Sequence, residues 1–205
     1  DAVKTELKHT AVNSRSRGGT TALMAAAAAG QPDVLQWLLT KVPGVQVDAQ
    51  CELGNTALNW AVRYGQEAAV RVLVARKVDV NAPNTDGYTP LATAAHEGHL
   101  GIARILLDSG AKTDIKENEG YTPLMWAAEE GHGELLSLLL ERGAAIDATN
   151  NRGGTALMWS AYAGKVDSVG RLVAKGGEPN TQDASAFTAL ILALGQTHIA
   201  CVRVL

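Results

Sequence analysis

The stretch Gly120–Gly131, GYTPLMWAAEEG, recurs along the whole chain. Its counterpart 33 residues earlier is Gly87–Gly98, GYTPLATAAHEG, and 33 residues later it is Gly153–Gly164, GGTALMWSAYAG. Further copies open at Gly19 and Gly54, and a degenerate copy covers residues 186–197. The central leucines, spaced by 35 and then four times by 33 residues, are Leu23, Leu58, Leu91, Leu124, Leu157 and Leu190. A fixed period of this length predicts a stack of small equivalent units rather than one globular core.

Each unit combines a turn, a short helix, a break, a second helix and a stop. The polar turn ends in glycine, as in NTDG (84–87), which suits a backbone with positive φ. A threonine such as Thr89 then predicts a helix N-cap, and Pro90 suits the first helical position. The second helix carries apolar residues at helical spacing and stops at Gly110, Gly143 or Gly176. One unit has too little core to fold alone, so neighbouring units are expected to stack.

The pattern resembles the ankyrin repeat. The residues that carry the resemblance recur in register, and in the third unit they are Thr89-Pro90-Leu91, Ala94-Ala95, Gly98-His99, Ile105-Leu106-Leu107 and Gly110-Ala111. The resemblance implies an all-α solenoid of helix–turn–helix units with hairpin-like turns. It also implies one array over residues 1–205: the end of a preceding partial repeat (1–15), then repeats at about 16–48, 51–81, 84–114, 117–147, 150–180 and 183–205, the last of them truncated.

One position departs from the family. Ankyrin repeats usually carry a histidine after the central leucine, where it ties adjacent units by hydrogen bonds. Here that position holds Met24, Asn59, Ala92, Met125, Met158 and Ile191. Because methionine fills irregular apolar gaps, we expect apolar packing at this position in place of the histidine ties.

Composition narrows the function classes. A net charge of −3 gives no argument for nucleic acid or a membrane as a global partner. The alanine run Ala25–Ala29 is too short to span a bilayer, and the first ten residues lack the apolar stretch of a secretion signal. Cys51 and Cys201 lie in distant units and cannot pair within one stack. We therefore expect an intracellular, cytoplasmic protein without membrane insertion.

Motifs that carry catalysis do not stand out in the sequence. It has no nucleophile elbow, no phosphate-binding loop and no dinucleotide glycine motif. His96 and His99 are separated by Gly98, and no carboxylate or thiol cluster completes a zinc site. Glu129 and Glu130 are adjacent on a helix and diverge by about 100°, so they do not face each other. We therefore predict a non-catalytic protein that needs no cofactor, metal or small molecule.

The aromatic residues are distributed unevenly. Trp37 is on an outer helix, whereas the remaining aromatics fall on the turns and inner helices, which by the ankyrin resemblance line one concave face. They are Tyr88, Tyr121 and Phe187 after the turns, Trp60, Trp126 and Trp159 within the inner helices, and Tyr64 and Tyr162 near the inner helix ends. We expect the two turn tyrosines to be exposed. The three tryptophans either wedge between inner helices or form part of a contact surface.

Charged residues on the same face suggest a partner. The acidic residues of the third and fourth repeats there are Asp86, Glu97, Glu119, Glu129 and Glu130, and they are flanked by Arg63 and Arg152. They form either an ordinary solvated surface or an acidic groove for a basic segment. With inner helices about 10 Å apart, an extended segment of about 15 residues would fill the groove.

We therefore predict a scaffold that binds another protein, as a peptide or a domain and with a basic partner as one option, on the concave face. The candidate contact residues are Tyr88, Tyr121, Trp126, Glu97, Glu129, Glu130, Trp60, Tyr64, Arg63, Trp159, Tyr162 and Arg152. Two alternatives stay open: a targeting or regulatory module of a larger enzyme or channel, and an architectural subunit of a large assembly, for which Trp37 is the best support. The segment Leu73–Asn81 also resembles ankyrin sequences in which asparagine is hydroxylated, which makes Asn81 a candidate modification site.

Overall fold

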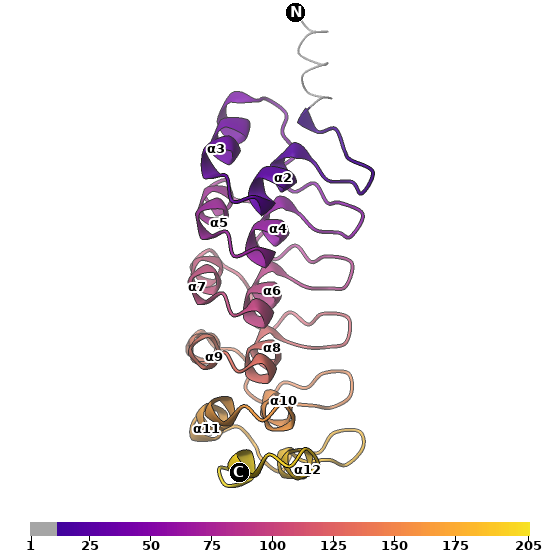
Figure 1. Ribbon diagram of the computed structural model, residues 1–205, viewed down its shortest axis with the longest axis vertical. Helices are drawn as coiled ribbons and strands as arrows, with labels where there is room; N and C mark the ends of the chain where they lie inside the picture. The colour runs from indigo at the N-terminus through magenta and orange to yellow at the C-terminus, as the bar shows by residue number, and fades with distance from the viewer. Residues whose placement is uncertain (1–11) are drawn as a thin grey trace, which may run out of the picture.

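The computed structural model describes residues 12–205, and the expected partial repeat over 1–15 lies largely outside this range. The described chain forms short helices in two parallel columns, with turns projecting from the inner column (Figure 1). The inner helices are α2 (Ala22–Ala28), α4 (Ala57–Arg63), α6 (Pro90–Glu97), α8 (Pro123–Glu130), α10 (Ala156–Tyr162) and α12 (Ala189–Gly195). The outer helices are α3 (Pro32–Lys41), α5 (Glu67–Val74), α7 (Leu100–Asp108), α9 (Gly133–Glu141), α11 (Val166–Ala174) and α13 (Ile199–Val202). The predicted all-α solenoid is confirmed.

Every inner helix starts in the same way. A threonine side chain accepts a hydrogen bond from the backbone N–H three residues later, which satisfies one of the free donors of the first turn. Pro90 and Pro123 occupy the first helical positions of α6 and α8, as the sequence predicts. Each such cap stabilises its helix by about 1 kcal/mol, which matters for helices of only two turns.

The stop and turn positions keep their backbone conformation even where glycine is replaced. Gly120 has φ 86°, and Ala186, at the equivalent place of the last unit, has φ 62°. Thr197 likewise takes φ 60°, where the preceding unit has Gly164 at 70°. The last unit therefore follows the same path as the others, at the cost of placing side chains in the left-handed region.

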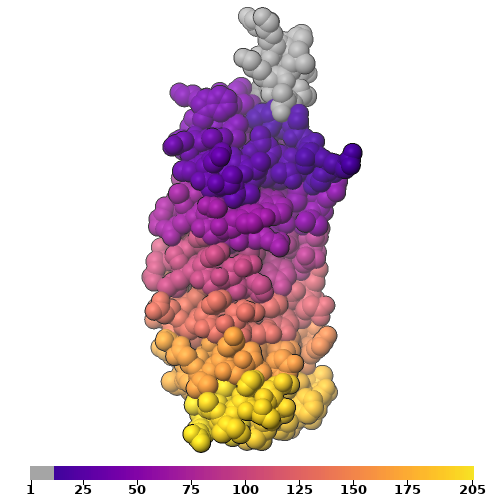
Figure 2. All heavy atoms as spheres, viewed as in Figure 1, coloured from indigo at the N-terminus to yellow at the C-terminus, as the bar shows by residue number. Residues whose placement is uncertain are grey.

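The core is continuous along the stack. Five of the six central leucines are no more than 3% exposed, because each lies between its own helix pair and the next unit. In a space-filling view the colours form successive bands, one unit after another, as expected when contacts connect only neighbours (Figure 2). Leu190, in the last unit, is 41% exposed.

Two series of hydrogen bonds tie consecutive units. At the turn tips, backbone N–H groups donate to the previous turn, as from Thr85 N to Leu53 O (3.1 Å) and from Asn118 N to Asp86 O (3.1 Å). At the base of the turns, side chains accept from the next unit; Asp114 Oδ1, for example, accepts from Ala145 N at 2.9 Å. The equivalent acceptors are Asp48, Asn81 and Asp147. The units are thus joined by polar contacts between their turns and by apolar contacts between their helices.

The position after the central leucine is only partly as expected. Met24, Met125 and Met158 are buried and apolar. Asn59, however, donates from Nδ2 to Ala82 O of the next turn (3.3 Å), so the prediction of apolar packing is wrong there. Ile191 is 44% exposed.

Histidines at a different position connect the units. The rings of His99, His132 and His198 lie against the break glycines of the preceding units, Gly65, Gly98 and Gly164. His132 Nε2 also lies 3.1 Å from His96 O. A Cβ at Gly98 would approach the His132 ring to 2.5 Å, so the glycine is needed both for φ and for this contact.

Candidate partner-binding face

Four rings from three units form a stacked column on the face made by turns and inner helices. In order they are Tyr88, Trp126, Tyr121 and Trp159, with successive ring centroids 5.5, 4.6 and 5.1 Å apart and planes inclined by 31°, 24° and 34°. We call this set the aromatic column. Each tyrosine reaches the tryptophan of the following unit, so the column runs along the stack and links the third, fourth and fifth units.

The column corrects the expectation that the turn tyrosines are exposed. Tyr88 and Tyr121 are half-buried, because the tryptophans cover their rings. Trp126 and Trp159 are half-buried as well, and their indole Nε1 atoms have no hydrogen-bond partner among the described residues. Burial, with help from Glu117, Asp86 and Glu129, raises the pKa of Tyr88 to about 12.

Tyr64 and Tyr162 remain outside the column as exposed side chains, at 55% and 42%. Tyr64 stacks on Trp60 at 5.9 Å, and this pair forms a separate aromatic contact in the second unit. Tyr162 meets the edge of Trp159 at 6.0 Å. These residues offer more free ring surface than the turn tyrosines.

A carboxylate that the sequence analysis did not select lies beneath the column. Glu117 is 7% exposed, and its two oxygens accept from Glu119 N (3.0 Å) and Tyr121 N (2.8 Å). In the neighbouring units, Asn84 and Asn150 close the turn in the same way. Alignment of Glu117 with these asparagines was the signal that could have identified it, because Glu117 places a negative charge where the two neighbouring units have a neutral amide.

A cavity of about 310 Å³ opens beside the column, and we call it the acidic pocket. Its lining residues are Tyr88, Glu117, Glu119, Tyr121, Trp126, Glu129 and Arg152. Glu129 is half-buried, and its Oε2 atom has no partner among the described residues. Desolvation raises the pKa of Glu129, and Glu130 raises it further, whereas His96 and Lys165 lower it. Three carboxylates thus face a single guanidinium.

A smaller cavity of about 160 Å³ is lined by predicted contact residues of the second and third units. Its lining residues include Arg63, Asp86, Tyr88, His96 and Glu97. Glu97 Oε1 lies 3.5 Å from His96 Nδ1, so it has a partner when this histidine is protonated. Glu130 is exposed and lines neither of these two cavities.

Beyond Trp159, a third cavity of about 260 Å³ lies between the fifth and sixth units. We call it the Gly154 pocket, and its walls include Gly154, Met158, Trp159, Tyr162 and Leu192. Arg152 and Asp183 also line it. Among the aromatic-face cavities this one has the most apolar walls, which distinguishes it from the acidic pocket.

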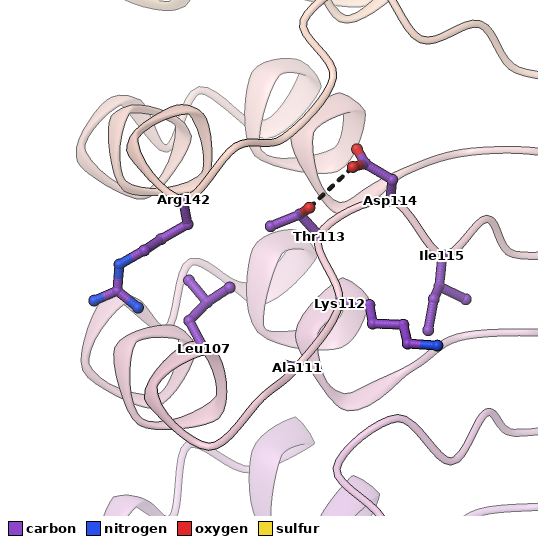
Figure 3. A pocket seen from close by; sticks show the side chains of 7 residues that line it. All are labelled: Leu107, Ala111, Lys112, Thr113, Asp114, Ile115 and Arg142. Carbon is purple, nitrogen blue, oxygen red and sulfur yellow. Dashed lines mark hydrogen bonds between the residues drawn. The ribbon is translucent and has the colours of Figure 1, made fainter.

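A cavity of about 510 Å³ lies at the ends of α7 and α9 and contains none of the predicted contact residues. Arg142 extends from the end of α9 toward α7, and Thr113 and Asp114 form the opposite wall (Figure 3). Arg142 pairs with Asp108 at 2.8 Å, and Asp114 accepts from Ala145 N. Arg142 and Asp114 are therefore used within the fold.

Asn81 belongs to the polar series at the base of the turns. Its Oδ1 accepts from Lys112 N at 2.9 Å, and its Nδ2 donates to Gly110 O at 3.4 Å. The side chain thus joins the second and third units, as the aspartates do elsewhere in the series.

Comparison with known families identifies the class of protein. A family model described as ankyrin repeats (3 copies) matches residues 1–84, 77–150 and 135–205, which together span the chain. The chain therefore belongs to the ankyrin repeat family. Ankyrin repeats generally mediate protein–protein interactions and are typically non-catalytic. None of the helices described in residues 12–205 is long and apolar enough to cross a membrane.

Proposed function

We propose that this ankyrin array binds a basic segment of another protein, with the acidic pocket receiving a lysine or arginine side chain. The observation that carries the proposal is Glu129, which lines the pocket and whose Oε2 atom is buried without a hydrogen-bond donor among the described residues. A carboxylate in this state gains from a cation that restores the interactions lost on burial. Glu119 and Glu117 add negative charge on the same side, against the single guanidinium of Arg152.

The aromatic column forms one wall of the acidic pocket, and it does not supply the main attraction for the cation. Trp126 has Tyr88 on one side and Tyr121 on the other, so its ring faces are not free for a cation–π contact. The carboxylates of the acidic pocket must therefore supply the main attraction for the cation. The rings exclude water beside them, which strengthens the ion pair.

Binding of two peptides tests this function: one of alternating lysine and alanine, the other with glutamate in place of lysine. We expect the lysine peptide alone to bind, more weakly as salt increases. Glu119→Gln with Glu129→Gln should lower its affinity, by about 1 kcal/mol or roughly fivefold per charge at low salt. Glu134→Gln with Glu141→Gln, which removes two charges from α9, should have little effect. Equal losses in both double variants would reject the acidic pocket.

A second candidate is an architectural contact through the outer helices. Trp37 is 57% exposed on α3 and Val34 on the same helix is 42% exposed, which favours a lateral protein contact there. Trp37→Ala should then weaken assembly with a partner without changing lysine-peptide binding. A role as the targeting module of a larger enzyme or channel stays a hypothesis that the complete reading frame decides.

An intracellular, cytoplasmic setting fits the two cysteines, which are buried and unpaired. Hydroxylation of Asn81 also stays a prediction. A hydroxylase would have to displace the bonds of Asn81 to Lys112 and Gly110 before reaching its Cβ. Intact mass after incubation with an asparagine hydroxylase checks it: one added oxygen in the wild type and none in Asn81→Ala.

A further inference from the structure

The aromatic column stops where a glycine replaces a tyrosine. Tyr88 and Tyr121 hold equivalent positions, and the next equivalent position, 33 residues later, is Gly154. The ring of Tyr121 lies between Trp126 of its own unit and Trp159 of the next. The residues equivalent to that pair around Gly154 are Trp159 and Leu192.

Trp159 and Leu192 both line the Gly154 pocket. The pocket is therefore bounded by the same two positions that enclose Tyr121, with Met158 and Tyr162 completing its walls, and the Trp159 indole lies against Gly154 itself. Its volume of about 260 Å³ suits one inserted side chain, since pockets for whole small ligands run from roughly 300 to 1,000 Å³.

The pocket has a hydrogen-bond acceptor at its polar end. Asp183 Oδ1 accepts from Ser185 N (2.8 Å) and Phe187 N (2.9 Å), which leaves Oδ2 without a donor among the described residues. Asp183 is the residue equivalent to Asn150, whose Oδ1 accepts from Arg152 N and Gly154 N in the same way one unit earlier. An inserted ring that carries a hydroxyl donor matches both the apolar walls and this carboxylate.

We propose that the Gly154 pocket binds a tyrosine side chain of the partner, with its ring between Trp159 and Leu192 and its hydroxyl directed at Asp183. This inference rests on the proposed function, because the same segment would place a basic residue in the acidic pocket. The two pockets share Arg152 and belong to neighbouring units about 10 Å apart. An extended segment covers that distance in about three residues, so the partner carries a tyrosine about three residues from a lysine or arginine.

The first test uses p-cresol, the side chain of tyrosine, on the full chain. We expect p-cresol to move the indole N–H signal of Trp159 in a saturable way, with the signal assigned through Trp159→Phe, and to leave that of Trp60 in place. 4-Methylanisole, whose oxygen carries no proton, should bind several-fold more weakly. No saturable change at Trp159 overturns the proposal.

The second test places the tyrosine in the chain itself. A Cβ at Gly154 would lie 2.8 Å from Trp159 Nε1, so the indole of Gly154→Tyr must shift, toward the arrangement that Trp126 has beside Tyr121. We expect this variant to lose p-cresol binding, whereas Ser109→Tyr, which adds the same group to an exposed turn at the end of α7, keeps it. Undiminished p-cresol binding by folded Gly154→Tyr contradicts the proposal. If that variant does not fold, Leu192→Ala replaces it, with several-fold weaker binding expected and unchanged binding as the contrary result.

The tests separate this inference from the proposed function. Glu119→Gln with Glu129→Gln should weaken lysine-peptide binding and preserve p-cresol binding. Gly154→Tyr should weaken p-cresol binding and preserve lysine-peptide binding. Failure of one pocket therefore leaves a measurable result for the other.

Discussion

The fourth and the last units have the same local design and very different burial. Thr122 and Thr188 both cap their inner helices by accepting from the backbone N–H three residues on. Leu124 and Leu190 hold the same position, yet one is 1% exposed and the other 41%. Helix α8 packs between α6 and α10, whereas α12 packs on α10 and α13. Secondary structure is thus set within a unit, and burial is set by its neighbours.

The largest expected effect comes from truncating the central leucine. Leu124→Ala removes a fully buried side chain that two neighbouring units cannot fill, so it should lower the free energy of unfolding by about 2–5 kcal/mol. Leu190→Ala should cost less than about 1 kcal/mol, because much of that side chain is already in water. Urea unfolding followed by circular dichroism measures both. Equal losses would show that burial in this array does not depend on neighbours.

The turn glycine gives the next effect. Gly120 has φ 86°, and a Cβ there would lie 2.6 Å from Asn151 N of the next turn. Gly120→Ala should therefore cost more than the strain of about 1–2 kcal/mol expected from the backbone alone. Gly143→Ala is the control, since Gly143 has φ 88° and nothing within 4 Å of the added atom. Similar melting points for the two variants would argue against a close approach of the turns.

The same position in the last unit should respond in the opposite direction. Ala186 already has φ 62°, so Ala186→Gly relieves strain while adding freedom to the unfolded chain. The net gain in stability should be no more than about 1 kcal/mol. Thermal unfolding of Ala186→Gly and of Thr197→Gly checks it, and a lower melting point for both would refute the strain argument.

The smallest effect depends on pH. Burial raises the pKa of Glu129 above its usual value near 4.5, so ionisation costs the folded state free energy at all pH values above the folded pKa. Glu129→Gln should therefore stabilise the protein near neutral pH by less than about 1 kcal/mol, and this gain should vanish at about pH 4. Glu130, His96 and Lys165, which also act on the pKa of Glu129, are present in both the wild type and the variant. Melting points at the two pH values test this prediction, with Glu134→Gln as the control. A stabilisation by Glu129→Gln that increases as the pH falls would contradict it.

The sequence was sufficient for the parts of the fold that depend on single units. Thr89 and Pro90 predicted the start of α6, and Gly110 predicted the end of α7. The period then gave the stacking order. The ankyrin resemblance also placed Tyr88, Trp126, Tyr121 and Trp159 on one face.

The details of the face depended on contacts between units, which sequence reasoning did not resolve. Tyr88 was expected to be exposed, but the offset between units brings it onto Trp126 rather than into solvent. Asn59 was grouped with methionines, although a donor at that position reaches the next turn. Glu117 was overlooked because its carboxylate closes a turn, and its effect on the pKa of Tyr88 depends on a ring from another unit.

The hydrogen bonds between consecutive turns have a mechanical consequence. They join residues only about one period apart, such as Lys112 to Asn81 at a separation of 31 and Asn118 to Thr85 at 33. Within residues 12–205, no bond of this series joins the first unit to the last. If the array is stretched from its two ends, tension is carried in series, and units should peel away one by one from an end, each lengthening the molecule by a similar step.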